Sequence, residues 1–457
     1  MHWRSPQSML FAEARTPHRK RHMSDIPISR TTRPTRAVVI AAIIFACVYI
    51  AVDLNKLWAL RYGADTGNFL QWLVGEAYGR GSWNGAEYRP HLQVHDSWSL
   101  LALVPVLWVF PYAQTLLIIQ VCAIAAGGPA LCSFARACGA NSRGAGAVGI
   151  AYLLSPFTQG LAQGNFIENI FVPSLAFLGA IAARRRALLG TLMIAQVLLG
   201  LKEDEALFLV WFGIACALWW DRRIGYSVAA LATVNGLAFL IAEHIHGAHP
   251  SIPQYGLVID DPLSKLGFFA ALLGGFAFAP IVLGRTLVLA TPLVAELILA
   301  RPWAYQIVRI GTHWSAPLFA ATAIAAAFVI GRRPGFATPM LICATLCALT
   351  INDTALKIGR WPYVVDRGAY SAATELRVSA RRVVLPRHEE GIYAVAASNP
   401  RVLLAHYRAG EGGYCPAYNT NARAFFASIG VGSWPAGIAL CGGVPVPTLV
   451  PTTHPER

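Results

Sequence analysis

Long runs of apolar residues, separated by short polar turns, recur along most of the chain. Each run is about fifteen to twenty residues long, close to the ~20 residues with which a helix crosses the ~30 Å hydrocarbon core of a bilayer. The pattern predicts an all-α integral membrane protein. Its eleven expected membrane-spanning helices occupy residues 37–52, 113–134, 144–161, 167–183, 187–201, 206–220, 224–242, 266–284, 286–300, 315–330 and 336–351.

The same pattern divides the chain into three parts. Residues 1–36 form a basic tail, for which Met23 is an alternative start, and residues 37–351 form the membrane domain. The first outer loop of that domain is expected at 53–97. The apolar segment Ser97–Phe110 contains Pro105 and would cover only ~20 Å at ~1.5 Å per residue, so we expect a juxtamembrane or re-entrant helix there. Residues 352–457 lack a clear periodicity and form either a small extracytoplasmic domain or a loosely packed extension.

Composition and charge exclude other classes of protein. Of the 457 residues, 56% are hydrophobic and 13% are charged, whereas soluble domains carry about 25% charged residues. A soluble enzyme is therefore excluded, and the short basic clusters do not resemble a nucleic-acid-binding module. The net charge of +14 is explained by topology, because Lys and Arg gather in cytoplasmic loops. With a cytoplasmic N-terminus and an extracytoplasmic C-terminus, the cytoplasmic side receives Arg136, Arg143, Arg184–Arg186, Arg222, Arg223, Arg285, Arg332 and Arg333.

Acidic residues and histidines gather on the opposite side of this predicted topology. Because several spans are short, their polar ends are expected at the depth of the lipid head groups, where a lipid phosphate lies. This clustering indicates a working face on the outer side. Its members are Asp65, His91, His95, Asp96, Glu168, Glu203, Asp204, Glu205, Glu243, His244, His246, Asp260, Asp261 and His313.

The first outer loop contains the first candidate group. Asp65 is placed to act as a general base on an acceptor hydroxyl, or alternatively to cap the helix that follows it. His95 and Asp96 could orient a substrate or bind a divalent metal ion together with Asp65. The alternative for His95 and Asp96 is the polar start of a helix.

Two further charged segments face the same side. Glu168 begins an apolar helix, where an acid either complements the helix dipole or contributes to a site. Residues 202–205 place four charges in a row between two short apolar helices, which is costly near a membrane and typical of function. Lys202 could pair with a lipid phosphate, with Glu203 or Asp204 holding it or a metal ion. The alternative is a hairpin turn in which Lys202 and Glu205 pair at helical spacing.

The remaining candidates lie nearer the C-terminus. Arg301, Arg309 and His313 flank Tyr305 in the last sizeable outer loop and could bind a phosphate, with interface anchoring as the equal alternative. The short spacing of His244, His246 and His249 favours a solvated loop over a zinc site. Cys415 and Cys441 lie in the outer tail, where a disulfide is permitted but not required.

Several of these residues stand in an order that resembles a known family. The motifs are Asp65-x-Gly67-x-Phe69-x-Gln71, Gly79-Arg80-Gly81, His95-x-Ser97, Ala151–Pro156, Glu168 with Pro173, Lys202-Glu203-Asp204 and the stretch from Tyr305 to Pro317. Over roughly residues 37–350 the chain resembles a bacterial family of predicted membrane proteins, catalogued as domain of unknown function two thousand and seventy-nine. The chain departs from the family pattern at Leu70, Val94 and Phe166.

That family is similar in layout to the C-type glycosyltransferase (GT-C) superfamily of polytopic membrane enzymes. The resemblance implies a bacterial inner-membrane glycosyltransferase that moves a sugar from a polyprenyl-phosphate-linked donor to a cell-envelope acceptor on the outer face. By the same resemblance Asp65 takes the base position and Lys202 with its acids lines the same face. We expect the catalytic residues to be Asp65 with His95 and Glu168 in support, and the substrate-binding residues to be Gln71, Lys202, Glu203, Asp204, Arg309 and His313. The candidate ligands of a divalent metal cofactor are Asp65 and Asp96.

Two other functions stay open at this point. A transporter or flippase for a lipid-linked or polar solute would also be polytopic, and a non-catalytic membrane subunit would only organise partners. Transporters usually carry charged residues at the bilayer midplane and internal repeats. Here the charges cluster on one side and no repeat is visible, which favours the enzyme.

Overall fold

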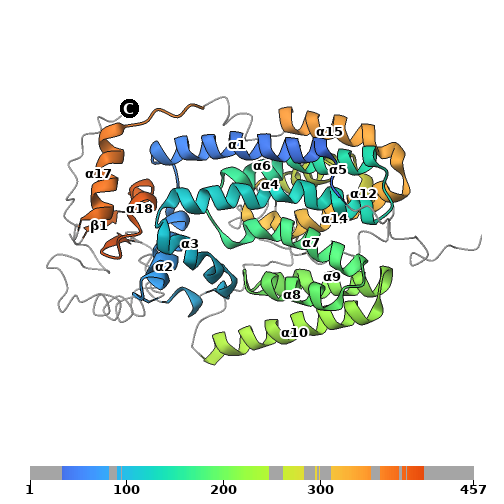
Figure 1. Cartoon of the computed structure of the whole chain (residues 1–457), viewed down its shortest axis with the longest axis horizontal. Helices are drawn as coiled ribbons and strands as arrows, with labels where there is room; N and C mark the ends of the chain where they lie inside the picture. Colours follow the sequence, from blue (N-terminus) through green and yellow to red (C-terminus); the bar gives the residue numbers. More distant parts are fainter. Residues whose placement is uncertain are drawn as a thin grey trace, which may run out of the picture.

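A computed structural model gives the fold of residues 33–81, 90–93, 95–245, 261–282, 294–295, 298, 310–350, 361–379, 383–386 and 389–405. Most of this part of the chain is helical (Figure 1). The bundle is formed by α1 (Arg36–Trp58), α4 (Ala113–Ala137), α5 (Ser142–Leu154), α6 (Pro156–Gln163), α7 (Val172–Arg184), α8 (Leu188–Leu199), α9 (Glu205–Trp219), α10 (Arg222–Ile245), α11 (Pro262–Gly274), α12 (Ala279–Val282), α14 (Ala316–Arg332) and α15 (Ala337–Thr350).

Four helical segments of the described chain are long and apolar enough to cross a membrane. They are Arg36–Trp58, Ala113–Ala137, Arg222–Ala242 and His313–Arg332. Shorter apolar helices accompany them at Trp98–Val109, Leu188–Leu199, Glu205–Trp219, Pro262–Gly274 and Pro334–Thr350. The protein is therefore a membrane protein with several apolar helices, and the count of eleven spans stays a prediction.

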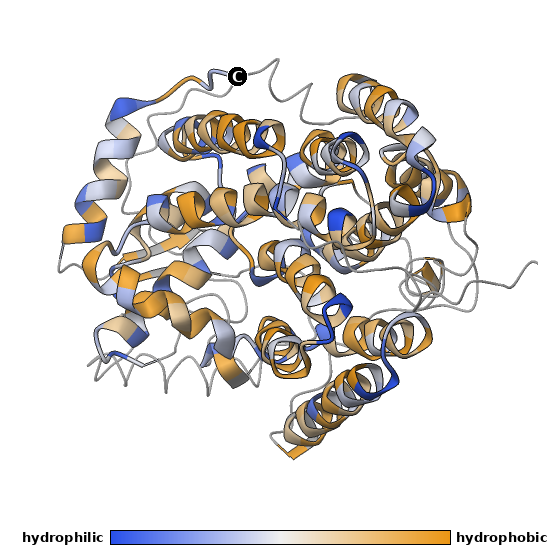
Figure 2. Cartoon of the chain, turned by 45° about the vertical axis from the view of Figure 1, so that its right-hand side comes forward, coloured by the Kyte–Doolittle hydropathy of each residue, from blue (hydrophilic) through white to orange (hydrophobic). Residues whose placement is uncertain are grey.

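The four long segments differ in how much of each is covered by protein. The window that defines the span in α14 is 89% buried, whereas those in α1 and α10 are 33% and 22% buried. The outward face of α10 carries Val234, Leu237 and Ile241, each more than half exposed. An apolar face of this extent is unfavourable in water and is expected against lipid tails. Figure 2 shows the same contrast, with hydrophobic residues along the helices and hydrophilic ones mainly at their ends.

Two predicted segments need correction in detail, and a third lies mostly outside the described residues. The run 144–161 is not one helix, because Ser155 has a ψ of 134° and its hydroxyl accepts a hydrogen bond from Phe157 N, so α6 starts anew at Pro156. The run 266–284 is interrupted after α11 by a turn in which Ala277 and Phe278 have positive φ. Only residues 294–295 and 298 of the run 286–300 are described.

The predicted first outer loop is shorter and more structured than expected. Helix α1 continues to Trp58, so residues 53–58 are helical. Within the loop lie α2 (Ala64–Ala77) and a 3-10 turn at His91–Gln93, and a second 3-10 turn, at Trp98–Leu103, follows the loop. The second turn leads into α3 (Val104–Val109). The short helix expected at 97–110 is thus present, as a 3-10 turn followed by α3.

The described part of the C-terminal segment folds into a small α/β unit rather than a loose extension. It consists of α17 (Arg367–Val378), β1 (Val383–Pro386), α18 (Glu390–Ala396) and β2 (Val402–Ala405). The two strands pair in parallel, with Val383 opposite Val402, and α18 connects them. The sequence predicts no secondary structure for this part of the chain, and the two-stranded sheet lies outside the helical bundle. We call β1, α18 and β2 the C-terminal βαβ unit.

The C-terminal βαβ unit packs against α2. The Tyr393 hydroxyl donates to Gln71 Oε1 at 2.8 Å, and Gln71 Nε2 donates to the carbonyl of Val402 at 2.9 Å. Glu390 Oε2 accepts a hydrogen bond from the backbone N–H of Ala64 at 3.3 Å. Figure 1 shows α17, α18 and β1 at the same end of the molecule as α2.

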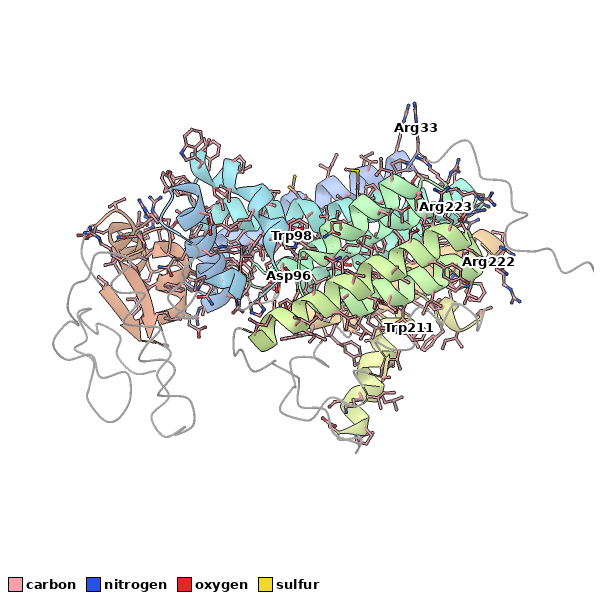
Figure 3. The ribbon with its side chains drawn as sticks, turned by 90° about the horizontal axis from the view of Figure 1, so that it is seen from below. Arg33, Asp96, Trp98, Trp211, Arg222 and Arg223 are labelled. Atoms are coloured by element: carbon pink, nitrogen blue, oxygen red, sulfur yellow. The ribbon has the colours of Figure 1, made fainter. Side chains whose placement is uncertain are left out.

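Charged residues separate to the two ends of the bundle. At one end, Arg143 donates to Thr338, which joins α5 to α15, and Arg186 faces Asp221 at 4.0 Å. Figure 3 places Arg33, Arg222 and Arg223 toward this end and Asp96 away from it. We call the two regions the basic end and the acid-rich end. The separation follows the predicted charge pattern, and which end faces the cytoplasm stays a prediction.

Short 3-10 turns precede α7, α14 and α15, at Glu168–Phe171, His313–Ser315 and Pro334–Phe336. Glu243 and His244 lie in the last turn of α10. Outside the described residues lie Met23, His246, His249, Asp260, Arg285, Arg301, Tyr305, Arg309, Cys415 and Cys441.

Candidate functional site

Asp65 stands in the first turn of α2, where its carboxylate is held by an asparagine from a distant part of the chain. Asn165 Nδ2 donates to Asp65 Oδ2 at 3.0 Å, and Asn165 Oδ1 accepts from Gly63 N at 2.9 Å. The N-cap of α2 is Gly63, so the alternative prediction of Asp65 as the cap is wrong. Asp65 is only half-buried, which leaves its carboxylate reachable by a substrate.

The segment Gln163–Asn169 connects the predicted site residues, and we call it the bridging segment. Helix α6 ends at Gln163, and Gly164 then takes an extended conformation, so the chain runs across the acid-rich end. Its carbonyl at Gln163 accepts from Lys56 Nζ at 2.6 Å. Its Phe166 N–H donates to the Thr66 hydroxyl at 3.1 Å. One short stretch therefore contacts both α1 and α2.

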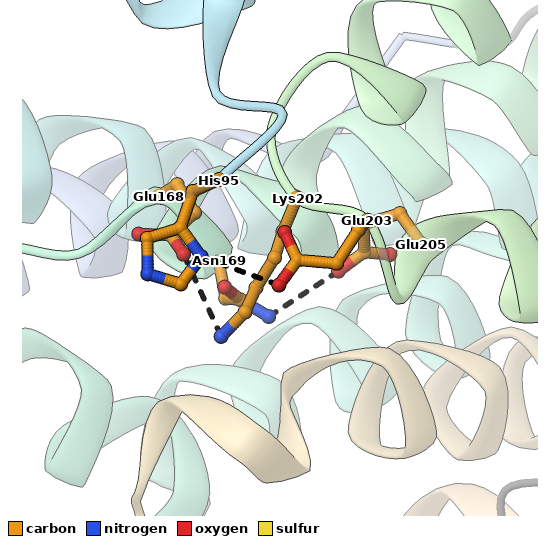
Figure 4. Close-up of polar contacts among 6 residues, drawn as sticks. All are labelled: His95, Glu168, Asn169, Lys202, Glu203 and Glu205. Atoms are coloured by element: carbon orange, nitrogen blue, oxygen red, sulfur yellow. Dashed lines mark hydrogen bonds and ion pairs between the residues drawn. The ribbon is translucent and has the colours of Figure 1, made fainter. Parts of the chain in front are cut away.

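At its far end the bridging segment meets the charged residues 202–205. Glu168 Oε1 lies 3.5 Å from Lys202 Nζ, with both side chains at most 5% exposed. Asn169 Nδ2 donates to Glu205 Oε1 at 3.4 Å. Figure 4 shows these residues converging with His95 and Glu203. We call the six labelled residues the buried ionic cluster.

His95 joins the cluster from the segment between α2 and α3. Its Nδ1 lies 3.2 Å from Glu203 Oε1, and because a carboxylate only accepts hydrogen bonds, that nitrogen is the donor. The His91 ring stacks on Trp72 at 4.1 Å between centroids and lies 5.4 Å from the His95 ring. The aromatic stack ties the loop to α2, which carries Asp65.

Electrostatic effects within the cluster are large because Glu168, Lys202 and Glu205 are buried, whereas His95 and Glu203 are half-buried. Burial alone would lower the pKa of Lys202, but Asp204, Glu168, Glu203 and Glu205 outweigh it and raise that pKa. Burial would likewise raise the pKa of Glu203, yet the hydrogen bond and charge of His95, with Lys202 beside it, lower it to about 2.

The pKa of Asp96 shifts in the opposite direction to that of Glu203. Its partial burial, and then the negative charge of Glu203, raise the pKa of Asp96. This carboxyl therefore keeps its proton to a higher pH than a solvated aspartate does. It is the more weakly acidic of the two neighbouring groups.

Lys202 is compensated from inside the protein. Besides the ion pair with Glu168, its ammonium group lies 4.0 Å from the centroid of the Trp314 ring. His313, which begins the 3-10 turn before α14, lies against the same tryptophan at 4.8 Å between ring centroids. The alternative pairing with Glu205 at helical spacing is not the ion pair observed. Acidic groups outnumber cations here, so an anionic phosphate is disfavoured at Lys202.

The structure brings most of the predicted residues to the acid-rich end but gives them different surroundings. His95, Glu168, Lys202 and Glu203 form one cluster, and Asp65 joins it through the bridging segment. Asp204 is half-buried at the start of α9. Gln71, predicted to bind substrate, instead contacts the C-terminal βαβ unit with both polar atoms.

The predicted metal ligands do not converge with others. Asp65 contacts Asn165, and Asp96 lies near Glu203. Within the ranges that the structure describes, no group of three or more His, Cys, Asp or Glu side chains is arranged to hold a metal ion. The seven described cysteines are free thiols.

Sequence reasoning missed Asp53, which is fully buried although it lies in α1. It stands one turn before Lys56, whose ammonium lies 4.1 Å from the centroid of the Tyr62 ring. Burial, followed by the negative charge of Asp53, raises the pKa of Tyr62. Asn165, Asn169 and Trp314 were also missed, because only the fold reveals the charged partners of neutral side chains.

Comparison with known proteins finds one family model that matches part of the chain. A search of the curated proteins finds no match, and a search of the solved structures finds none either. The family model described as "Predicted membrane protein (DUF2079)" matches residues 56–256. The matched region contains Asp65, the bridging segment and Lys202. Residues 56–256 of this chain are therefore similar to the DUF2079 family of predicted membrane proteins.

Proposed function

We propose that the protein is a membrane glycosyltransferase that moves a sugar from a polyprenyl-phosphate-linked donor to an envelope acceptor at the acid-rich end. The observation that carries the proposal is the half-buried carboxylate of Asp65, held in one orientation by Asn165 at 3.0 Å. A carboxylate positioned in this way is suited to general-base catalysis.

In the proposed reaction Asp65 accepts the proton of an acceptor hydroxyl. That oxygen then forms a bond to the anomeric carbon of the sugar, while the bond between the same carbon and the carrier phosphate breaks. The electron pair of the broken bond leaves with the polyprenyl phosphate. Asn165 orients one carboxylate oxygen and leaves the other for the acceptor.

The buried ionic cluster plays a supporting part in this proposal. The ion pair of Glu168 with Lys202 fixes the far end of the bridging segment, whose near end holds Asp65 through Asn165. His95 fixes residues 202–205 through Glu203. We infer that Glu168, His95 and Lys202 act as positioning residues, and that Lys202 is the counter-ion of Glu168 rather than a ligand of phosphate.

The proposal is tested by Asp65→Asn in a transfer assay with a lipid-linked sugar donor in proteoliposomes. Loss of a general base lowers rates by about 10²-fold or more, so we expect at least that loss. Asparagine can still accept from Asn165, so the melting temperature should stay close to that of the wild type. Glu76→Gln, on the same helix and half-buried, is the matched control and should change the rate less than about twofold. Full activity of Asp65→Asn would refute the assignment.

One observation favours transport as a second candidate function. Asp53 is a fully buried acid within the first candidate span, and ionisable residues in spans commonly mark ion or substrate pathways. If the protein is a transporter, proteoliposomes will show counterflow of an unmodified solute and Asp53→Asn will abolish it. Uptake without chemical change would replace the glycosyltransferase proposal.

A further inference from the structure

A groove of about 500 Å³ lies between the end of α1 and the C-terminal segment, apart from the buried ionic cluster. Its volume falls within the range of small-molecule sites, about 300–1,000 Å³. Trp58, the last residue of α1, forms one wall, and the opposite wall is built by α17 and the residue before its cap. The lining residues are Trp58, Val365, Arg367, Tyr370, Ser371 and Thr374.

The lining combines one cation with hydroxyl groups. Arg367, Ser371 and Thr374 come from successive turns of α17, and Ser371 and Arg367 are exposed. Arg367 is the first residue of that helix, so the partial positive charge of the helix N-terminus adds to its own. The neighbouring acid Asp366 is occupied as the N-cap, accepting from Ala369 N at 3.0 Å, and does not line the groove. Arginine and hydroxyl donors suit a phosphate group.

The position of the groove indicates where such a phosphate would come from. Trp58 ends a helix long enough to cross the membrane and is 42% exposed. Tryptophan at the end of a span is typical of the head-group region of a bilayer. Five residues, 59–63, separate Trp58 from α2 and hence from Asp65. Hydrogen bonds between Asn55 and the backbone of Tyr363 hold the two walls together, at 2.7 and 3.3 Å.

The groove offers a cation that a phosphate group can reach, whereas Lys202 does not. Lys202 is enclosed and surrounded by acids, whereas Arg367 lines the open groove, and the neighbouring Asp366 caps α17. We propose that this groove binds the phosphate head group of a membrane lipid, with Arg367 as the partner of the anion and Trp58 against the first part of the lipid chain. The identification of that lipid as a polyprenyl phosphate rests on the proposed function; binding of a lipid phosphate does not.

The test measures binding without turnover. The full-length protein in detergent micelles is titrated with polyprenyl monophosphate, with the same polyprenol lacking phosphate, and with inorganic phosphate, and bound ligand is counted by native mass spectrometry. We expect binding of the monophosphate, with Arg367→Ala weakening it about tenfold or more. Arg377→Ala is the matched control, because Arg377 lies on the same helix but stacks on Tyr112 at 4.5 Å; its effect should stay below twofold.

Three outcomes of this titration overturn the proposal. Equal losses in the two arginine variants would assign the effect to net charge, and equal binding of the neutral polyprenol would remove the phosphate from recognition. Binding of inorganic phosphate with the same dependence on Arg367 would show a free-anion site instead of a lipid site. Arg367→Lys, which keeps the charge, and Ser371→Ala provide further variants if Arg367→Ala does not fold.

A parallel transfer assay separates this proposal from the proposed function. Binding that depends on Arg367 without any sugar transfer supports the groove and refutes the glycosyltransferase. Transfer by a protein whose binding is unaffected by Arg367→Ala refutes the groove alone.

Discussion

At the residue scale, the acid-rich end is organised by charges that compensate one another inside the protein. The sequence indicates a functional role for Lys202, because four charged residues stand in a row at 202–205. Its partner Glu168 lies 34 positions earlier, at 3.5 Å in space. Sequence could flag both residues as unusual but not as partners, because the pairing depends on the path of the bridging segment.

The buried ion pair leads to a first prediction. Lys202→Met leaves Glu168 buried without its cation, and removing one partner of a buried pair typically costs about 3–5 kcal/mol. We expect the free energy of unfolding in detergent to fall by roughly that amount. Adding Glu168→Gln to the same chain should restore at least half of the loss. A double variant as unstable as the sum of the two single variants would exclude the pairing.

A second prediction concerns pH and Glu203. Its pKa is lowered from the usual 4.5 to about 2, so the ionised form is favoured in the folded protein. The resulting stability is present above about pH 4.5 and is lost as the pH falls toward 2. Between pH 6 and pH 3 the wild type should therefore lose more stability than Glu203→Gln, measured by denaturant unfolding. Parallel losses in the two proteins would contradict the assignment.

At the element scale, α2 contacts both the bridging segment and the C-terminal βαβ unit. Gly67 faces the Tyr393 ring so closely that a Cβ at this position would collide with it. The hydrogen bonds of Gln71 lie one turn further along. The sequence motif that contains Gly67 and Gln71 therefore has a packing role as well as its proximity to Asp65.

The third prediction tests this packing. Gly67→Val should push the C-terminal βαβ unit away from α2, because the new side chain must displace the Tyr393 ring. Amide hydrogen exchange should rise in residues 390–396. Gly267→Val, on α11, meets only open space and should leave exchange there unchanged. Combining Gly67→Val with Tyr393→Ala should recover part of the protection; a fully protected unit in Gly67→Val would contradict the contact.

The elements differ in how well sequence could anticipate them. Apolar runs correctly indicated helices at α1, α4, α7, α8, α9, α10, α14 and α15, because a helix is the backbone structure that satisfies its own hydrogen bonds in lipid. The break between α5 and α6 carried a signal, Ser155-Pro156, which hydropathy alone does not weigh. The strands of the tail are four residues each, too short for an alternating pattern to emerge.

At the scale of the whole molecule, charge and apolar exposure together give a direction to the bundle. Arginines gather at the basic end, and α1 and α10 present apolar faces between the two ends. The positive-inside rule then predicts that the basic end faces the cytoplasm. The same rule places the groove, Asp65 and the C-terminal βαβ unit outside.

The fourth prediction is a labelling pattern for this orientation. Cysteines introduced at the exposed positions Arg185 and Gly335 should react with a membrane-impermeant thiol reagent only when it is applied from the cytoplasmic side. A cysteine at the exposed Tyr78 should react only from outside. The unsubstituted protein gives the background of the native thiols. Reversal of the two patterns would invert the molecule and remove the outer-face reaction.

The enclosure of α14 has a consequence for how the protein is made. This helix is covered by α4, α5, α7, α9 and α12, all of which are synthesised before it. A helix that is synthesised late and finally lies in the centre of the bundle cannot simply be added to the outside of a finished bundle. The earlier helices must stay apart, or part again, until α14 arrives, so biogenesis passes through an open intermediate that a membrane chaperone would have to shield.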